Sequence, residues 1–414
     1  MSTPLLNTRR RSTPPAAPVA FAALTLAALT LAALTLAFGA PSLGAQPSPR
    51  LMLRAENLLP IERPEEIVSV PWSTVTSKLS GASASKVRVT DADGRAVLSQ
   101  VVDNDADGMP DALIFQTSFG AKDTRRFTVE AVAPPAMPSR VFIRHDDPRD
   151  DIAWENDRGA WRIYGEGLKK TSSAMSSSGI DVWSKKTRAL IVEKWYSKGH
   201  DSYHIDMGEG ADFFDVGETL GAGGTAVWKG DTIYRADNFK AWKILANGPL
   251  RATFELRYDP WNAAGTSVSE IKRISVDAGQ MLFREESTFK VENGGATTVP
   301  YVIGLVKRPG LIGSTSRVGP YAWVSGWGPT APKNGGHGEI GTAVLLPRDK
   351  VTDWKEVHGH YLAVSSATSG TPVVNYVGSA WTAGGDITSP QAWWRYLDAF
   401  GQRLATPIKV SAEP

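Results

Sequence analysis

The sequence predicts an all-β protein: one large antiparallel β-sandwich with a smaller β region in front of it. From residue 139 to residue 412, short β-prone runs alternate with clusters of Gly, Pro, Asn and Asp. Apolar residues do not repeat with a helical period over any long stretch, and residues 391–401 form the best helix candidate. Regular spacing of short strands with so little helix is typical of a β-sandwich.

The composition is that of a soluble globular protein. The 414 residues are 42% hydrophobic and 21% charged. The net charge is +2, and no long basic tract follows the first dozen residues, so a nucleic-acid partner is not expected. The glycine-rich residues 221–225 lack the lysine of a phosphate-binding loop, so no nucleotide cofactor is expected.

The N-terminus has the pattern of an export signal. Arg9, Arg10 and Arg11 precede an apolar run at residues 19–38, and small residues at 42–45 form a cleavage site. We therefore predict a signal peptide at residues 1–45 and a periplasmic or secreted protein without membrane contact after cleavage. The apolar run is also long enough to span a bilayer, so a retained N-terminal anchor is the alternative.

Two β regions are predicted after this signal. The first covers residues 46–133, with strand alternation at 86–90 and 126–130 and a hairpin turn at 91–94. Proline-rich residues 133–138 form a stiff junction. The sandwich is predicted for residues 139–412. Its clearest strand candidates are residues 189–195, 252–258, 281–291 and 361–365.

Acidic residues at alternate positions near residue 105 predict a site for a hard cation. They precede Gly108, which allows a sharp turn, and oxygen-rich loops of this kind hold Ca²⁺. A full EF-hand loop needs an acid where Ile114 stands, so a shorter calcium loop with a structural role is expected. The predicted ligands are Asp103, Asp105, Asp107 and Asp111. The alternative is a solvated acidic turn.

Residues 200–217 are the first candidate for an active site. Their eighteen positions hold two histidines, five acidic residues, a tyrosine and three glycines, a mixture unsuited to a core. If residues 202–206 are extended, His204 and Asp206 share a face, and a carboxylate there would raise the basicity of the imidazole. His204 or Tyr203 is the candidate base. Substrate contacts are expected from His200, Glu209 and Asp212.

A second candidate is the strand-like run at residues 154–158. Alternation places Trp154 and Arg158 on one face and Glu155 and Asp157 on the other. The arginine could neutralise a sugar carboxylate, and the two carboxylates could act as acid and base. Trp154, together with Trp183, could stack on the apolar face of a sugar ring.

The chain also resembles a bacterial family of exported proteins, DUF4861. The resemblance rests on the runs QVVDNDADGMPDALIF (100–115), AWENDR (153–158), GIDVW (179–183), NGPLRATFEL (247–256) and on residues 203–217. Members tend to be encoded beside genes for pectin and uronate degradation, which implies work on carbohydrate. The run at 247–256, followed by the turn at 277–279, is similar to the galactose-mutarotase-like supersandwich. No catalytic residue is carried over from the family.

These observations support an exported enzyme that acts on uronate-containing, pectin-like oligosaccharides or polysaccharides as a lyase or a hydrolase. A mutarotase-like epimerase and a non-catalytic carbohydrate-binding protein are the alternatives. An enzyme requires His204, Asp206 and Arg158 to converge in one concave site. A binding module needs only a flat aromatic platform, for which the candidates are Trp154, Trp183, Trp195 and Trp242.

Overall fold

The structure is a computed structural model that describes residues 49–170, 177–295, 297–330 and 337–414, without the side chains of residues 200 and 201. Ser48–Pro414 forms one compact unit. The predicted signal peptide at residues 1–45 lies outside the described residues. Within the described ranges, no helix has the length and apolar character needed to cross a membrane. The fold is all-β, as predicted, and its sheets are antiparallel.

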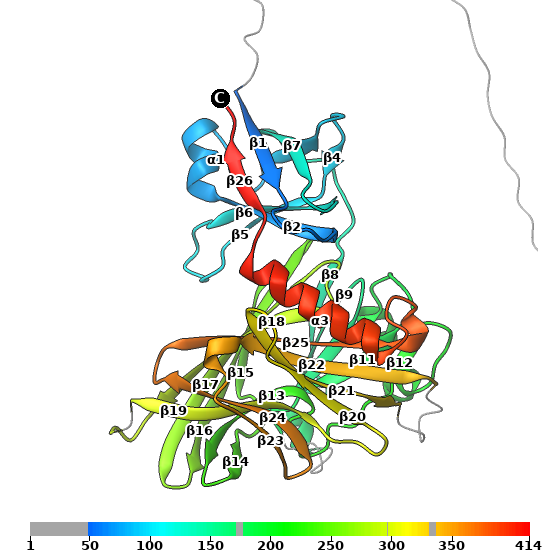
Figure 1. The fold of residues 1–414 in the computed structure, drawn as a ribbon, viewed down its shortest axis with the longest axis vertical. Helices are drawn as coiled ribbons and strands as arrows, with labels where there is room; N and C mark the ends of the chain where they lie inside the picture. The colour runs from blue at the N-terminus through cyan, green and yellow to red at the C-terminus, as the bar shows by residue number, and fades with distance from the viewer. Residues whose placement is uncertain (1–48, 171–176, 296, 331–336) are drawn as a thin grey trace, which may run out of the picture. The chain divides into compact units, whose positions relative to one another are not determined.

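The N-terminal region consists of a five-stranded and a three-stranded sheet (Figure 1). The first has the order β26 (Lys409–Ala412), β1 (Arg50–Glu56), β7 (Thr124–Glu130), β3 (Arg88–Asp91), β4 (Ala96–Val97). The second has the order β2 (Arg63–Pro71), β6 (Ala112–Phe119), β5 (Ser99–Val102). The predicted hairpin turn at residues 91–94 connects β3 and β4.

Alternation along β6 divides its side chains between two cores. Leu113 and Phe115 pack into the core of the N-terminal region, with Phe127 as a neighbour. Ile114, on the other face of the strand, packs into the main core of the sandwich. The N-terminal region is therefore joined to the sandwich by buried apolar side chains.

The sandwich region contains three sheets. The largest has eight strands in the order β15 (Ala241–Asn247), β16 (Arg251–Ala263), β17 (Thr266–Asp277), β18 (Leu282–Val291), β25 (Pro372–Trp381), β22 (Glu339–Pro347), β21 (Tyr321–Pro329), β20 (Ile312–Ser316). A five-stranded sheet has the order β14 (Thr232–Arg235), β13 (Ala222–Lys229), β19 (Thr298–Val306), β24 (His360–Thr368), β23 (Asp353–Val357). A second five-stranded sheet has the order β12 (Gly210–Asp212), β11 (Asp181–Lys185), β10 (Ala160–Tyr164), β9 (Asp151–Asn156), β8 (Val141–Asp146).

The strands predicted at residues 252–258, 281–291 and 361–365 are confirmed as parts of β16, β18 and β24. Their inward residues form one continuous apolar core with residues from all three sheets of the sandwich region. Phe254, Ile274 and Phe283, for example, are each at most 1% exposed. Burial of such side chains, at about 25 cal/mol per Å² of apolar surface, is the main source of stability.

The core of the sandwich also contains charged groups. The Nζ atom of Lys272 lies 3.1 Å from Glu285 and 3.6 Å from Glu270, and all three side chains are fully buried. The same nitrogen donates to Thr225 at 2.9 Å. Glu270 and Lys272 occupy inward positions of β17, where the alternation of the strand would normally place apolar residues.

In the described part of the chain, the helices are α1 (Trp72–Lys78), α2 (Val192–Ser197) and α3 (Pro390–Ala405), with 3₁₀ segments at Glu166–Lys170, His200–His204, Arg348–Lys350 and Thr382–Gly384. The predicted helix at residues 391–401 is confirmed as part of α3. Ser389 caps it by accepting a hydrogen bond from Ala392 N–H, and Pro390 follows the cap. Trp393 and Leu397 then pack in one apolar cluster with Trp327 of β21.

The strand predicted at residues 189–195 is wrong, because helix α2 begins within this run. The Glu155 carboxylate accepts hydrogen bonds from the backbone N–H groups of Ile191 and Val192, at 2.7–2.9 Å. These are the donors that the first turn of a helix leaves without an internal partner. The contact across the fold overrides the β propensity of the sequence.

The C-terminal strand returns to the N-terminal region. β26 lies beside β1 (Figure 1) and pairs with it. Leu53 and Ala412 are opposite each other in this register. The division of the chain at residues 133–138 and the end of the sandwich at residue 412 stay predictions. The pairing nonetheless means that the sheet of the N-terminal region contains both ends of the described chain.

Candidate active site

Residues 202–206 are not extended, in contrast to the prediction. His200–His204 forms a 3₁₀ segment, and a turn follows before β12. Asp206 accepts hydrogen bonds from the N–H groups of Gly208 and Gly210 and forms an ion pair with Lys186 at 2.7 Å. The carboxylate predicted to support His204 therefore stabilises a turn instead.

A different carboxylate lies beside His204. The Nδ1 atom of His204 is 3.6 Å from the Oδ2 atom of Asp212, whose side chain is only 3% exposed. The His204 side chain is 31% exposed and is therefore open to solvent. An accessible imidazole thus lies against a buried carboxyl group.

Strand pairing explains how Asp212 reaches the centre of the site. β12 pairs with β11 so that Asp212 is opposite Trp183, and β11 pairs with β10 so that Asp181 is opposite Arg162. The side chains of Arg162, Asp181 and Asp212 are each at most 7% exposed. Three neighbouring strands therefore bring an arginine and two aspartates together.

Arg162 is the central cation of this cluster. Its Nη2 atom donates to Asp181 Oδ2 at 2.7 Å and to Asp212 Oδ2 at 3.0 Å, while Nη1 donates to the Tyr203 hydroxyl at 3.3 Å. The Tyr164 hydroxyl donates to Asp181 at 2.8 Å. Such charge-assisted hydrogen bonds hold the cluster in one arrangement.

A third aspartate extends the cluster. Asp151 accepts a hydrogen bond from the Tyr196 hydroxyl at 2.8 Å, and its Oδ2 atom lies 3.9 Å from Arg162 Nη1. Among the described residues, this buried oxygen has no hydrogen-bond partner. The guanidinium group of Arg162 therefore faces three carboxyl groups. Because one positive charge does not neutralise three negative charges, this arrangement favours protonated carboxyl groups.

The electrostatic consequences follow from burial and from this excess of acid. Burial, and next the charge of Asp181, hold the pKa of Asp212 well above its usual range, although Arg162 acts in the opposite direction. Burial raises the pKa of Asp151 to about 6, again against the attraction of Arg162. Burial also raises the pKa of the Tyr203 phenol. Carboxyl groups with raised pKa values beside an accessible histidine are typical of sites that transfer protons.

The aromatic residues near the site are packed rather than displayed. The Tyr203 ring stacks on Trp183, with ring centroids 4.8 Å apart. Trp183 is 1% exposed, and Trp154 is fully buried between Phe254 and Phe283. The predicted stacking of Trp154 and Trp183 on a sugar has no exposed face to support it.

The acidic and basic residues of the run at 154–158 make structural contacts. Glu155 forms a fully buried ion pair with Lys185 at 2.7 Å, in addition to its bonds to α2. Asp157 pairs with Arg140 and accepts a hydrogen bond from Gly279 N–H. Arg158 pairs with Glu65 and with Asp386. Strand β9 ends at Asn156, so the predicted alternation does not extend to Asp157 and Arg158, and each charge has a partner within the fold.

The remaining predicted contacts have separate positions. Glu209 pairs with Lys194 at 2.7 Å and accepts a long hydrogen bond from Trp195 Nε1 at 3.4 Å. The backbone of His200 begins the 3₁₀ segment, while its side chain lies outside the described residues. Of the predicted site residues, the structure thus brings together Tyr203, His204 and Asp212.

The acidic loop has a geometry that suits a metal ion. Ligand oxygens of Asp103, Asp105 and Asp111 lie within 4.8 Å of one another. Asp103 also accepts hydrogen bonds from the N–H groups of Ala106 and Gly108. Asp107 is outside this group, and its carboxylate accepts a hydrogen bond from Met109 N–H. Calcium binding stays a prediction.

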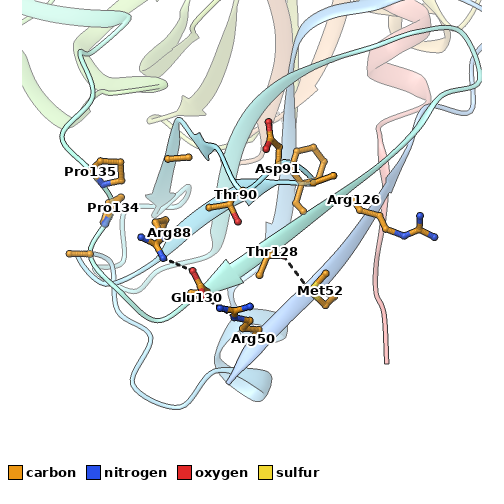
Figure 2. Close-up of a pocket in the computed structure, with 15 residues that line it drawn as sticks. Arg50, Met52, Arg88, Thr90, Asp91, Arg126, Thr128, Glu130, Pro134 and Pro135 are labelled. Atoms are coloured by element: carbon orange, nitrogen blue, oxygen red, sulfur yellow. Dashed lines mark hydrogen bonds and ion pairs between the residues drawn. The ribbon is translucent and has the colours of Figure 1, made fainter. Parts of the chain in front are cut away.

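An open groove of about 790 Å³ lies on the N-terminal region, with β1, β3 and β7 as its floor. Figure 2 shows Arg88 and Arg50 on either side of Glu130, and Pro134 and Pro135 at the edge. The two arginine side chains are 38% and 62% exposed, and their pairing with Glu130 lowers the pKa of this carboxyl. This solvent-facing pairing contrasts with the buried cluster around Arg162.

Comparison with known proteins places the chain in a family. A family model described as domain of unknown function DUF4861 matches residues 55–410. The chain belongs to this family. A relative from Formosa agariphila, named Uncharacterized protein P7, is 30% identical over 392 residues, which cover 90% of this chain and 96% of the relative. The resemblance found in the sequence is thereby confirmed.

Solved structures show a weaker likeness to this DUF4861 chain. An α-mannosidase from Enterococcus faecalis matches with a TM-score of 0.43 and 8% identity over 88% of this chain and 46% of its own. A glycosyl hydrolase family 38 protein from the same organism matches with a TM-score of 0.46 and 10% identity, covering 88% of this chain and 47% of its own. The chain spans about half the length of these enzymes. At these scores, the likeness supports no conclusion about chemistry.

Sequence reasoning missed Arg162, Asp181 and Asp151. Arg162 stands between Trp161 and Ile163 in a strand whose residues are all buried. A lone arginine in an otherwise apolar run was the available signal, because buried arginine requires acidic partners. Strand pairing decides which aspartates become the acidic partners of this arginine.

Proposed function

We propose that this DUF4861 chain is an exported carbohydrate-active enzyme whose chemistry is proton transfer at a sugar carbon, with His204 as the base. The observation that carries the proposal is the contact between the exposed His204 imidazole and the buried Asp212 carboxyl, at 3.6 Å. A general base must be open to its substrate and supported by a group that stabilises its protonated form.

Asp212 is suited to this supporting role. Its raised pKa makes the Asp212 carboxylate a good proton acceptor. When Nε2 of His204 takes the proton from the sugar carbon, Nδ1 can pass its own proton to this carboxylate, so that one bond to hydrogen forms for each that breaks. Arg162, at 3.0 Å, holds the carboxylate in place before the transfer.

This arrangement favours β-elimination or epimerisation over hydrolysis. Glycoside hydrolysis needs two carboxyl groups that face each other across an open cleft. Asp151, Asp181 and Asp212 are each at most 3% exposed. Elimination from a uronate requires one accessible base for the proton next to the sugar carboxylate, which His204 supplies.

A non-catalytic binding protein receives less support. Of the four tryptophans considered for a stacking platform, Trp154, Trp183 and Trp195 are at most 5% exposed. Trp242 is 41% exposed, but its ring stacks on His145 at a centroid distance of 4.2 Å. These four residues therefore do not form a flat aromatic surface.

The test is incubation of the mature chain with pectic and other uronate oligosaccharides. Elimination produces an unsaturated uronate, which absorbs in the ultraviolet, whereas hydrolysis produces reducing ends without this absorbance. We expect an absorbance increase that is lost in His204→Ala and kept in His358→Asn. His358 is exposed and has a positive φ of 51°, which asparagine tolerates. Reducing ends without absorbance would contradict elimination, and inactivity on every substrate with retained binding would favour the sugar-binding alternative.

A further inference from the structure

A separate cavity of about 570 Å³ lies against the outer face of the eight-stranded sheet. We define the outer face as the one that carries Arg251, Arg273 and Arg284, opposite the face that packs into the core. The other walls come from β2, from the last turns of α3, and from Asn104 and Asp105 of the acidic loop. The volume is within the range of about 300–1,000 Å³ that is usual for small-ligand sites.

Arginine dominates the lining of this cavity. Five arginines line it, namely Arg63, Arg251, Arg273, Arg284 and Arg403. Four carboxylates accompany them, so the lining has one positive charge in excess. The guanidinium group of Arg251 is held by two bonds to Asp277, at 2.6 and 2.8 Å. Arg63 and Arg403 both bind Glu66, at 2.8 and 3.0 Å. These fixed pairs form a rigid polar frame.

Arg273 uses most, but not all, of its donors within the fold. It donates to the backbone carbonyls of Asn104 and Asp105, at 3.1 and 3.2 Å, and to Glu255 at 3.3 Å. Its buried Nε atom has no hydrogen-bond partner among the described residues. The buried Nε atom of Arg63 also has no hydrogen-bond partner among the described residues. Buried donors without partners are costly. Arg284, whose side chain is 37% exposed and bonds to Glu286 at 2.6 Å, presents further N–H donors to an anionic ligand in the cavity.

Aromatic rings complete the cavity. Tyr376 and Phe400 both line it and meet edge to face, with centroids 5.6 Å apart. An aromatic ring provides apolar contact for the carbon-bound hydrogens of a pyranose, while arginine forks bind carboxylate or sulfate oxygens in pairs. The two features together fit a charged sugar better than a neutral one or a simple anion.

We propose that this cavity binds a saccharide unit that carries a carboxylate or a sulfate group. None of its lining residues belongs to the cluster around His204, Asp212 and Arg162, so it is a second site on the same chain. It does not depend on the proposed catalysis. Arg273 and Arg284 bind the anionic group, and Tyr376 contacts the ring.

The experiment is calorimetric titration of the mature chain with three trisaccharides: a galacturonate trimer, its methyl ester, and a sulfated neutral trimer. The His204→Ala background prevents turnover during the measurement. We expect the carboxylated or the sulfated trimer to bind at least about tenfold more tightly than the neutral ester. Tighter binding of one of these two identifies the source of the negative charge.

Substitutions of cavity residues test whether the saccharide binds in this cavity. Arg284 has a 37% exposed side chain, so Arg284→Gln is expected to fold and to weaken binding about tenfold, and Arg273→Lys is expected to weaken it by a similar factor because the fork is lost. The matched control is Arg257→Gln, an arginine of β16 that pairs with Glu255 and does not line the cavity. Equal binding of the neutral ester, or acid-sugar binding that both cavity variants leave unchanged, would overturn the proposal.

Discussion

The Nδ1 atom of His204 lies 3.6 Å from the Oδ2 atom of Asp212. The first prediction tests this contact through Asp212→Asn, which keeps the shape of the side chain but removes its ability to exchange a proton. We expect kcat on the preferred uronate substrate to fall by about 10²–10⁴-fold, with a much smaller change in KM. Steady-state kinetics measure both. Unchanged kcat in a folded variant would exclude Asp212 from the reaction.

The second prediction concerns the protonation of Asp151. Tyr196→Phe removes the hydroxyl that donates to this carboxylate at 2.8 Å. Because the hydrogen bond favours the charged form, its loss is expected to move the pKa of Asp151 upward from about 6. Carbon-13 NMR of the labelled aspartate carboxyl groups measures the shift. A downward movement of the pKa would show that another group controls it. Tyr361→Phe, the same change at a tyrosine of β24, is the control.

The third prediction links stability to pH through the buried Lys272 cluster. Burial raises the pKa of Glu285 to about 7, from 4.5, with Lys272 opposing the shift. Between these two pH values the folded state holds a proton that the unfolded state has lost, so this group's contribution to the free energy of unfolding falls as pH rises from about 4.5 to about 7. The loss across the window is on the order of 2–3 kcal/mol.

Glu285→Gln removes this titration and is expected to flatten the pH dependence. Urea denaturation of both proteins at several pH values gives the difference in the free energy of unfolding. Glu286→Gln is the matched control, because Glu286 is the next residue along β18 and lies on the other face. A parallel pH dependence in Glu285→Gln and in the wild type would contradict the assignment.

The fourth prediction concerns calcium. If Asp103, Asp105 and Asp111 bind Ca²⁺, a concentration 100-fold above the dissociation constant stabilises the fold by about 2.7 kcal/mol. We expect Ca²⁺ to raise Tm by several degrees, EDTA to reverse the change, and Asp105→Asn to abolish it. Asp93→Asn, in the exposed hairpin turn with Arg95, is the control. A Tm that does not respond to Ca²⁺ would favour a solvated acidic turn.

The fifth prediction tests why residues 192–197 are helical. Glu155→Gln breaks a fully buried ion pair with Lys185 and weakens the cap of α2. Loss of one partner of such a pair costs about 3–5 kcal/mol. Glu209→Gln, which breaks the exposed pair with Lys194, is expected to cost less than about 1 kcal/mol. Thermal denaturation compares the two variants, and equal small losses would contradict the role of Glu155.

The sequence predicted those parts of the fold that depend on local pattern. The β-prone runs identified parts of β16, β18 and β24, and the helix candidate at residues 391–401 identified part of α3. It failed at α2, because the carboxylate that starts this helix is in a distant strand. Segment 200–217 contains both His204 and Asp212, which the structure brings together. The partner of His204 was predicted to be Asp206, since the 3₁₀ turn was not foreseen.

Charged residues at inward positions of a strand show a second limit of prediction from sequence. Glu270 and Lys272 occupy the same face of β17 as Val268 and Ile274, so the pattern showed where they point. It did not show which groups would neutralise them, because Glu285 and Thr225 come from other strands. The side-chain environment of a sheet depends on register, which one strand alone does not specify.

The position of β26 has a consequence for how the protein matures. During synthesis, β1 emerges near the beginning, whereas its partner β26 follows only after more than three hundred further residues. Until then, one side of β1 is an open edge, the kind of surface that recruits foreign strands. The sheet that is begun first is thus completed last, and until then its open edge has to be protected by a chaperone or by rapid folding of the rest of the chain.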